Sequence, residues 1–334
     1  MKPSFRIEDR TRACPIGPDN PRNSEADLIL EADGALFLTY TEFVDGAGDF
    51  DRSRIALRTR SDRELHWSPS RLLLENPTGL NAMCPSLLDL GPIRLLLYLR
   101  KNALNDCRGW LARSSDRGIS WHEEETLITQ RPGYWVIENG CLRLLPSGRL
   151  ITAGAFTQEY RSGCTFRSIP LFSDDQGATW SEGEPIEIPA AWGALEPEVA
   201  ALPSGDLVML LRTGLGGPWI CHSSDEGATW SRPHPTGLRS PNSPHTVTTA
   251  PDGSLLLLYN DSDQLRTPLS IARSTDGGIS WLREGDLDSN PNRRFGYPSC
   301  TWDGDRLLAT WYEAPPGPPP GNCEIIYAQI HGLI

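Results

Sequence analysis

Six segments of the chain carry side chains that could bind an anion or move a proton. Each segment comes directly before a small-residue turn and an apolar run, and together they supply Arg22, Asn81, Asn139, Glu196, Asn242 and Tyr297. Arginine binds carboxylates through a planar, permanently charged group, whereas glutamate and tyrosine can exchange a proton. A segment that only supports a repeated structure needs no arginine, glutamate and tyrosine, so these differences predict a functional site.

A repeat spaces these segments along the chain. The octapeptides SSDRGISW, SDDQGATW, SSDEGATW and STDGGISW end at Trp121, Trp180, Trp230 and Trp281, and a degenerate copy, RSDRELHW, ends at Trp67. The intervals of about 50–60 residues are typical of a four-stranded propeller blade and not of a helical repeat.

A turn followed by an apolar run occurs six times in the chain. These stretches are residues 31–40, 91–100, 146–155, 203–212, 251–260 and 303–312. Helix signals are nearly absent, and 31 Gly and 29 Pro provide dense turn signals. We therefore predict an all-β fold, a six-bladed β-propeller formed by one domain over residues 1–334. The N-terminal segment is expected to complete the sixth blade, and the proline-rich residues 314–321 are expected to form a stiff loop.

The aspartates of the octapeptide are predicted to be structural. Asp116 can bind the backbone of its own turn, Gly118 permits a positive φ, and Trp121 can pack between blades. A catalytic aspartate or a Ca²⁺ ligand is needed once and not four times. We therefore expect four turns at the outer rim, on the face opposite the arginine cluster, at Asp116, Asp175, Asp225 and Asp276.

The octapeptide resembles the Asp-box, or BNR repeat, of the sialidase family, and the resemblance covers essentially the whole chain. Family members hold the substrate carboxylate with three arginines from different blades. The resemblance implies this role for Arg22 in PRNSE, Arg212 in LVMLLRT and Arg266 in LRTPLSIA. Arg100 and Asn139 are further candidates for substrate binding. Arg100 and Lys101 end a strand and are expected to point the same way as Arg212 does in its repeat.

The resemblance also implies catalytic residues. Tyr297 in GYPSC resembles the family nucleophile, and Glu196 in LEPEVAAL resembles the glutamate that activates it. A neutral phenol avoids the repulsion that an anionic nucleophile would meet at an anomeric carbon bearing a carboxylate. The family acid/base is an aspartate on an early loop, where either Asp49 or Asp51 fits. The alternative interpretations are a core aromatic for Tyr297 and a solvated acidic loop for the aspartates.

The implied function is a glycoside hydrolase, sialidase-like, that removes a terminal acidic sugar without a cofactor. The expected partner is a small carbohydrate or glycoconjugate. PRNSE departs from the F/Y-R-I-P motif that surrounds the first arginine of the family. The alternatives are a non-catalytic carbohydrate-binding propeller, a hydrolase or lyase for a different acidic sugar, and a protein-interaction scaffold.

Composition narrows the range of partners. The chain of 334 residues is 38% hydrophobic and 22% charged, as in soluble globular proteins, and its net charge of −12 argues against nucleic acid and anionic membranes as partners.

No apolar signal segment or membrane span is visible, so a cytoplasmic location is expected. The 8 Cys and 6 His form no metal motif, which predicts reduced, buried thiols and no metal site. The sequence indicates no oligomeric state.

Overall fold

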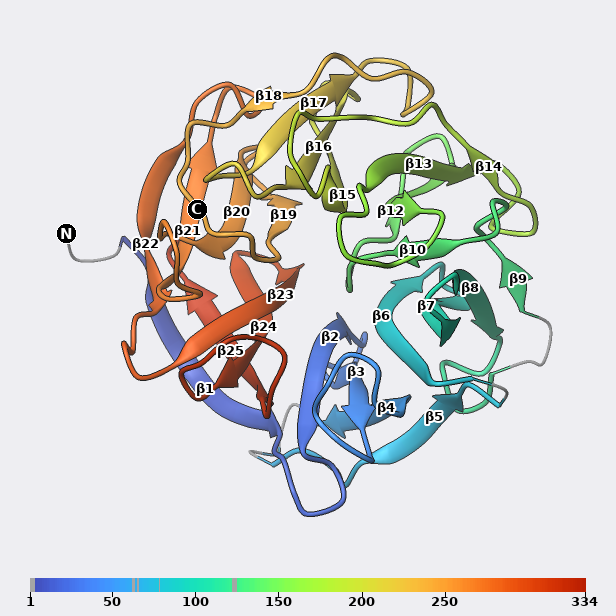
Figure 1. Cartoon of the computed structure of the whole chain (residues 1–334). Coiled ribbons are helices and arrows are strands. Elements are labelled where there is room, and N and C mark those ends of the chain that lie inside the picture. Colours follow the sequence, from blue (N-terminus) through green and yellow to red (C-terminus); the bar gives the residue numbers. More distant parts are fainter. Residues whose placement is uncertain (1–3, 62–63, 65, 78, 122–124) are drawn as a thin grey trace.

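The chain folds into a ring of six β-blades around a central axis (Figure 1), and single parallel pairings join the first three blades into one hydrogen-bonded sheet. The computed structural model describes residues 4–334 except 62, 63, 65, 78 and 122–124, and the described residues contain no helix, hence none that could span a membrane. The predicted all-β, six-bladed propeller is confirmed for this part of the chain.

Each blade runs from an inner strand at the axis to an outer strand at the rim. The first blade comprises β2 (Arg22–Leu30), β3 (Leu36–Phe43), β4 (Ser53–Arg60) and β5 (Arg71–Glu75). The second comprises β6 (Asn81–Asp89), β7 (Arg94–Ala103), β8 (Asp106–Ser114) and β9 (Thr126–Leu127). The third comprises β10 (Tyr134–Val136), β11 (Arg143–Leu144), β12 (Leu150–Thr157), β13 (Arg167–Ser173) and β14 (Ser181–Glu182).

The second half of the ring repeats this order. The fourth blade comprises β15 (Leu195–Ala201), β16 (Leu207–Arg212), β17 (Trp219–Ser223) and β18 (His234–Pro235). The fifth comprises β19 (Thr246–Thr249), β20 (Leu255–Asn260), β21 (Leu269–Ser274) and β22 (Leu282–Asp288). The sixth comprises β23 (Arg294–Asp303), β24 (Arg306–Ala314), β25 (Glu324–His331) and, at its outer edge, β1 (Arg6–Cys14).

The N-terminal strand closes the ring, as predicted. Strand β1 pairs antiparallel with β25, from Arg6 opposite His331 to Cys14 opposite Ile325. In Figure 1 it lies as a blue strand along the red C-terminal blade. The sixth blade is therefore built from both ends of the chain described here.

The six predicted apolar runs form the second strand of each blade, from β3 to β24. Nearly all side chains of these strands are buried, because each sheet packs face to face with its neighbours and leaves neither face to water. The core clusters accordingly join adjacent blades; Val208 and Leu210 of the fourth blade pack with Leu257 and Tyr259 of the fifth. The predicted stiff loop at 314–321 connects β24 and β25.

The four octapeptides form turns after the third strand of their blades, as predicted. In the fourth blade, Asp225 accepts hydrogen bonds from Ser223 Oγ and from the backbone and side chain of Thr229, at 2.6–2.8 Å. Gly227 has φ of 83° and donates to Ser223 Oγ at 2.9 Å. Equivalent bonds hold Asp116, Asp175 and Asp276.

The register places these turns on the face opposite Arg212. Ser223, which begins the turn, pairs with Leu207 at the start of β16, whereas Arg212 ends that strand and pairs with Leu195.

All eight cysteines are free thiols and seven of them are buried. The cytoplasmic location remains a prediction.

Candidate active site

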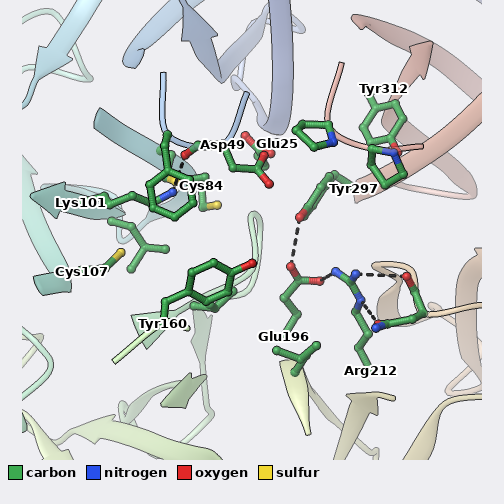
Figure 2. A pocket seen from close by; sticks show the side chains of 18 of the residues that line it. Glu25, Asp49, Cys84, Lys101, Cys107, Tyr160, Glu196, Arg212, Tyr297 and Tyr312 are labelled. Carbon is green, nitrogen blue, oxygen red and sulfur yellow. Dashed lines mark hydrogen bonds and ion pairs between the residues drawn. The ribbon is translucent and has the colours of Figure 1, made fainter. Parts of the chain in front are cut away.

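A cavity of about 270 Å³ opens at the mouth of the ring where the inner strands begin. Residues from all six blades line it. Its cationic side chains are Arg22, Lys101, Arg212, Arg266 and Arg294, and its carboxylates are Glu25, Asp49 and Glu196. Figure 2 shows Lys101 on one side, Tyr297 and Arg212 on the other, and Glu25 and Asp49 between them.

Four inner strands aim a side chain into this cavity by the same backbone device. Glu25, Cys84, Glu196 and Tyr297 have φ of 43°, 56°, 37° and 50°, and each lies at a register shift of its strand. A bulge redirects a side chain, and a positive φ at a non-glycine residue costs about 1–3 kcal/mol. Backbone strain of this kind is concentrated at functional sites. It therefore indicates, independently of side-chain chemistry, that these four positions belong to a functional site.

Two of these four positions, Glu25 and Cys84, were not predicted from the sequence. A signal for Cys84 was present, because Cys84, Glu196 and Tyr297 each precede a proline at the same point of the repeat. Glu25 has no such neighbour and could not be found in this way.

Tyr297, Glu196 and Arg212 form a hydrogen-bonded chain (Figure 2). The Tyr297 hydroxyl donates to Glu196 Oε1 at 3.0 Å, and Glu196 Oε2 is ion-paired with Arg212. Burial alone would raise the pKa of Glu196, but Arg212 lowers it below its usual value. Burial, and then the charge of Glu196, raise the pKa of Tyr297 well above its usual value. The pair therefore consists of an anionic carboxylate that faces a neutral phenol.

A second polar cluster is centred on Arg22. Its guanidinium donates to Asp49 Oδ1 at 2.6 Å, to Glu25 Oε1 at 3.1 Å and to the carbonyl of Ala47 at 3.2 Å. Burial raises the pKa of the Glu25 carboxyl, an effect that Arg22 partly offsets. Arg22 thus contacts two carboxylates at once.

The structure separates the two candidate aspartates. Asp49 lines the cavity with a half-exposed side chain, whereas Asp51 accepts from the backbone N–H of Gly48 at 2.7 Å and shapes the loop. Asn81 and Lys101 both donate to the Asp49 carbonyl, at 3.2 Å and 2.5 Å. Of the two aspartates, only Asp49 lines the cavity.

The third predicted arginine lies at the other side of the cavity. Arg266 donates to the Tyr312 hydroxyl at 2.8 Å and to the carbonyl of Asn242 at 3.5 Å. Arg294 also lines the cavity, lies over the Tyr312 ring with 5.7 Å to its centroid, and donates to the carbonyl of Pro315 at 3.1 Å. Arg294 was missed in the sequence because it belongs to no repeated motif.

Two predicted substrate-binding residues lie outside the cavity lining. Arg100 is ion-paired with Glu125 and lies over the Trp110 ring at 4.7 Å, because successive residues of a strand face opposite sides. Its neighbour Lys101 faces the cavity instead. Asn139 is fully buried and donates to the backbone carbonyls of Ala26 and Tyr297, at 2.7 Å and 3.5 Å. Neither of the two residues is among those that line the cavity.

Aromatic side chains form the wall of the cavity on the side of the third blade. Tyr160 has ring contacts, at centroid distances of 5.0–6.4 Å, with four others, and we call this group the aromatic wall: Phe50, Tyr134, Tyr160, Phe166 and Trp192. An apolar wall facing a few fixed polar groups is typical of small-molecule sites. Among the described residues, no group of three His, Cys, Asp or Glu side chains could hold a metal ion.

The fold and the site define a six-bladed β-propeller with an arginine-lined mouth. Residues 45–309 match the model of the BNR repeat-like domain, and the chain belongs to this family. No curated protein sequence matches the chain.

Many solved structures share the fold, and three of them illustrate the range. A protein of unknown function from Dyadobacter fermentans is 22% identical, with a TM-score of 0.81 over 98% of this chain and 99% of that one. The NanB sialidase of Streptococcus pneumoniae is 14% identical, with a TM-score of 0.76 over 96% and 71%. A Trypanosoma rangeli sialidase mutant with trans-sialidase activity is 14% identical, with a TM-score of 0.75 over 98% and 59%. The chain thus spans about three fifths of the trypanosomal protein.

Proposed function

We propose that the protein is an exo-acting glycoside hydrolase that removes a terminal acidic sugar, a sialic acid or a nine-carbon relative. The observation that carries this proposal is the hydrogen bond from the Tyr297 hydroxyl to Glu196 at the cavity. A phenol poised against an anionic carboxylate is an activated nucleophile, and it suits an anomeric carbon that bears a negative charge.

The reaction would proceed by two displacements. In the first, the Tyr297 oxygen attacks the anomeric carbon, the phenolic proton passes to Glu196, and Asp49 protonates the departing oxygen. In the second, Asp49 takes a proton from water, the water oxygen attacks the anomeric carbon, and Tyr297 leaves and regains its proton from Glu196. Asp49 must turn from Arg22 towards the leaving group, and its half-exposed position on the loop allows this.

Several features favour an enzyme over a non-catalytic binding propeller. A binding protein has no need for a tyrosine bonded to a glutamate at strained backbone positions, nor for a cavity-facing Asp49. The aromatic wall offers flat apolar faces to a sugar ring. The structural relatives include a Trypanosoma rangeli sialidase in complex with sialic acid and the same protein as a covalent intermediate with 2,3-difluorosialic acid.

The first test is Tyr297→Phe. Removal of the hydroxyl should reduce turnover of an aryl sialoside by at least about 10³-fold, since the covalent route is lost, while affinity for sialic acid stays within a few-fold. A 2,3-difluorosialic acid probe should label the wild-type peptide that contains FGYPSC, as detected by mass spectrometry. Full activity of the Phe variant would refute the nucleophile assignment.

A different acidic sugar is the second candidate substrate. The observation that favours it is the ion pair between Glu25 and Arg22. In the sialidase pattern the arginine at this position binds the substrate carboxylate, but here Glu25 already binds it. Turnover of 4-nitrophenyl uronides with none of the sialoside would support this candidate, and the Tyr297→Phe variant would then be compared on the uronide.

A further inference from the structure

The arginines of the cavity differ in how far the protein itself neutralises them. Arg22 is buried between Glu25 and Asp49 and lies over the Phe43 ring at 4.3 Å. Its guanidinium already donates to two carboxylates and one carbonyl. A substrate anion would have to compete with both carboxylates: displacing the buried Glu25 would leave a negative charge without its partner, and only the half-exposed Asp49 could turn away.

Arg212 is also committed to a protein carboxylate. It is ion-paired with Glu196 and donates to the side-chain and backbone oxygens of Asn242 at 2.7 Å and 3.1 Å. These contacts fix the base of the Tyr297 pair. The charge of Arg212 can attract an anion, but its hydrogen bonds go to Glu196 and Asn242.

Arg266 and Arg294 are the two cavity arginines that form no ion pair with a carboxylate among the residues that the structure describes, although the charge of Arg266 helps to lower the pKa of Glu196. Arg266 donates to a hydroxyl and a carbonyl, and Arg294 donates to one carbonyl through Nε. Arg294 is nine-tenths buried, with 8% exposure. Buried charges in proteins are normally paired. The buried Arg294, with the partly exposed Arg266 at the same cavity, therefore indicates that an anion from outside completes the site.

Both arginines approach the same tyrosine next to the proposed nucleophile. Arg266 bonds the Tyr312 hydroxyl and Arg294 lies over the Tyr312 ring. The Tyr312 and Tyr297 rings are 6.0 Å apart between centroids. The proline-rich loop lines the cavity here through Pro319 to Gly321, so an anion held by this pair would be partly shielded from water and would lie near the reacting carbon.

We infer that Arg266 and Arg294, and not Arg22, hold the anionic group of the substrate. Arg22 instead holds Glu25 in place, and holds Asp49 until it turns towards the leaving group. This assignment rests on the proposed function in taking the ligand to be an acidic sugar, and it departs from the residue set that the sialidase resemblance implies, because Arg294 replaces Arg22.

An experiment that needs no assumption about the sugar uses selenate as the anion. In wild-type crystals soaked with selenate at low millimolar concentration, anomalous scattering should locate selenium between the Arg266 and Arg294 guanidinium groups. Selenium at Arg22 with none between Arg266 and Arg294 would overturn the inference, as would an empty cavity.

Binding of an acidic sugar gives the quantitative test. Calorimetry would compare N-acetylneuraminic acid with its C1 carboxamide, which has the same shape without the charge. Arg294→Gln should reduce the preference for the acid by about 10- to 100-fold, the range expected for losing hydrogen bonds to a charged group. Arg294→Lys should restore only part of it, because an ammonium cannot bind a carboxylate bidentately.

The neighbouring residue provides the matched control. Arg293 carries the same charge one residue earlier, but it pairs with Glu313 outside this cavity, so Arg293→Gln should retain the wild-type preference. Thermal unfolding would establish that each variant is folded. A wild-type preference in both Arg294 variants would overturn the inference and leave the proposed function intact. If the wild type binds neither ligand, the acidic-sugar proposal fails for sialic acid, and the selenate result decides the anion site.

Discussion

At the scale of single residues, the site depends on how charge is distributed between neighbours. Arg212 keeps Glu196 anionic although Glu196 is buried, and the anionic Glu196 in turn disfavours ionisation of Tyr297. The Tyr297 proton can therefore leave only while the oxygen bonds to carbon, when Glu196 accepts it. Glu196 therefore activates Tyr297 without forming a free phenolate, which the substrate's own negative charge would repel.

Lys101 is predicted to position Asp49 for proton donation. Its ammonium is buried, donates to the Asp49 carbonyl at 2.5 Å and lies 4.4 Å from the centroid of the Phe50 ring. Lys101→Met fills the same space but releases the loop, so kcat/KM for a natural glycoside should fall by roughly 10- to 100-fold, as for other misplaced catalytic groups. An aryl glycoside, whose leaving group needs no proton, should lose less than about threefold.

The adjacent residue serves as the control for this prediction. Arg100→Gln removes a charge from the same strand but on the side that faces Glu125, so both substrates should react as with the wild type. Equal losses on the natural and aryl substrates in Lys101→Met would contradict a role through Asp49.

The pair Arg100 and Lys101 also shows what limits prediction at this scale. The sequence indicates that the second strand ends here with two cations, but the side that each faces depends on the parity of the strand against its neighbours. An error of one residue in the predicted register of this strand would place Arg100 in the cavity and Lys101 against Trp110, the reverse of what the structure shows. Arg294 escaped prediction for another reason, since its role arises from the approach of Arg266 and the loop before β25.

At the scale of elements, the repeats were predictable and the bulges were not. The second strands and the octapeptide turns follow local rules, namely an apolar run after a turn and a glycine at positive φ. The bulges at Glu196 and Tyr297 place non-glycine residues in a conformation that local preferences disfavour, and tertiary packing maintains it. Asn139 contributes by donating to the carbonyl of Tyr297, a contact between the third and sixth blades that no local pattern encodes.

The octapeptide turns should stabilise the fold in a pH-dependent way. Hydrogen bonds from the Thr229 side chain and backbone, and from Ser223, lower the pKa of Asp225 to about 2. Since this pKa is depressed in the folded state, its stabilisation is present above the unfolded-state pKa of about 4 and is lost as the pH falls towards 2. At pH 7, Asp225→Asn should lower Tm by about 1–3 °C and leave turnover unchanged.

Thermal unfolding at a series of pH values tests this prediction. The difference in Tm between Asp225→Asn and the wild type should shrink as the pH falls from 4 towards 2. Glu226→Gln is the control, because it removes the same charge one residue further along without touching the turn's hydrogen bonds. A difference that is independent of pH would show that the carboxylate charge does not stabilise the turn.

At the scale of the whole molecule, the cavity exists only while the ring is closed. Its residues come from all six blades, and Tyr297 in the sixth blade must lie within 3.0 Å of Glu196 in the fourth. Strand β1 supplies the closure. Its Asp9 bonds Arg60 of the first blade at 3.1 Å, and its Arg10 is ion-paired with Asp288 of the fifth at 2.7 Å, so the strand joins the last blade to both of its neighbours.

Deletion of residues 1–14 should therefore open the ring at the sixth blade. The deletion removes the buried Phe5, Ala13 and Cys14 and exposes the edge of β25, which can then pair with other chains. Hydrogen exchange should rise first in β25 and β24 and remain slow in β16, because local opening follows the loss of local contacts, and hydrolysis should be lost as Tyr297 separates from Glu196. The variant Arg6→Gln keeps the strand and removes only an exposed ion pair with Glu8, which contributes little, so its exchange in β25 should remain close to wild type. If the deleted protein keeps slow exchange in β25, the closure by β1 does not hold the ring together.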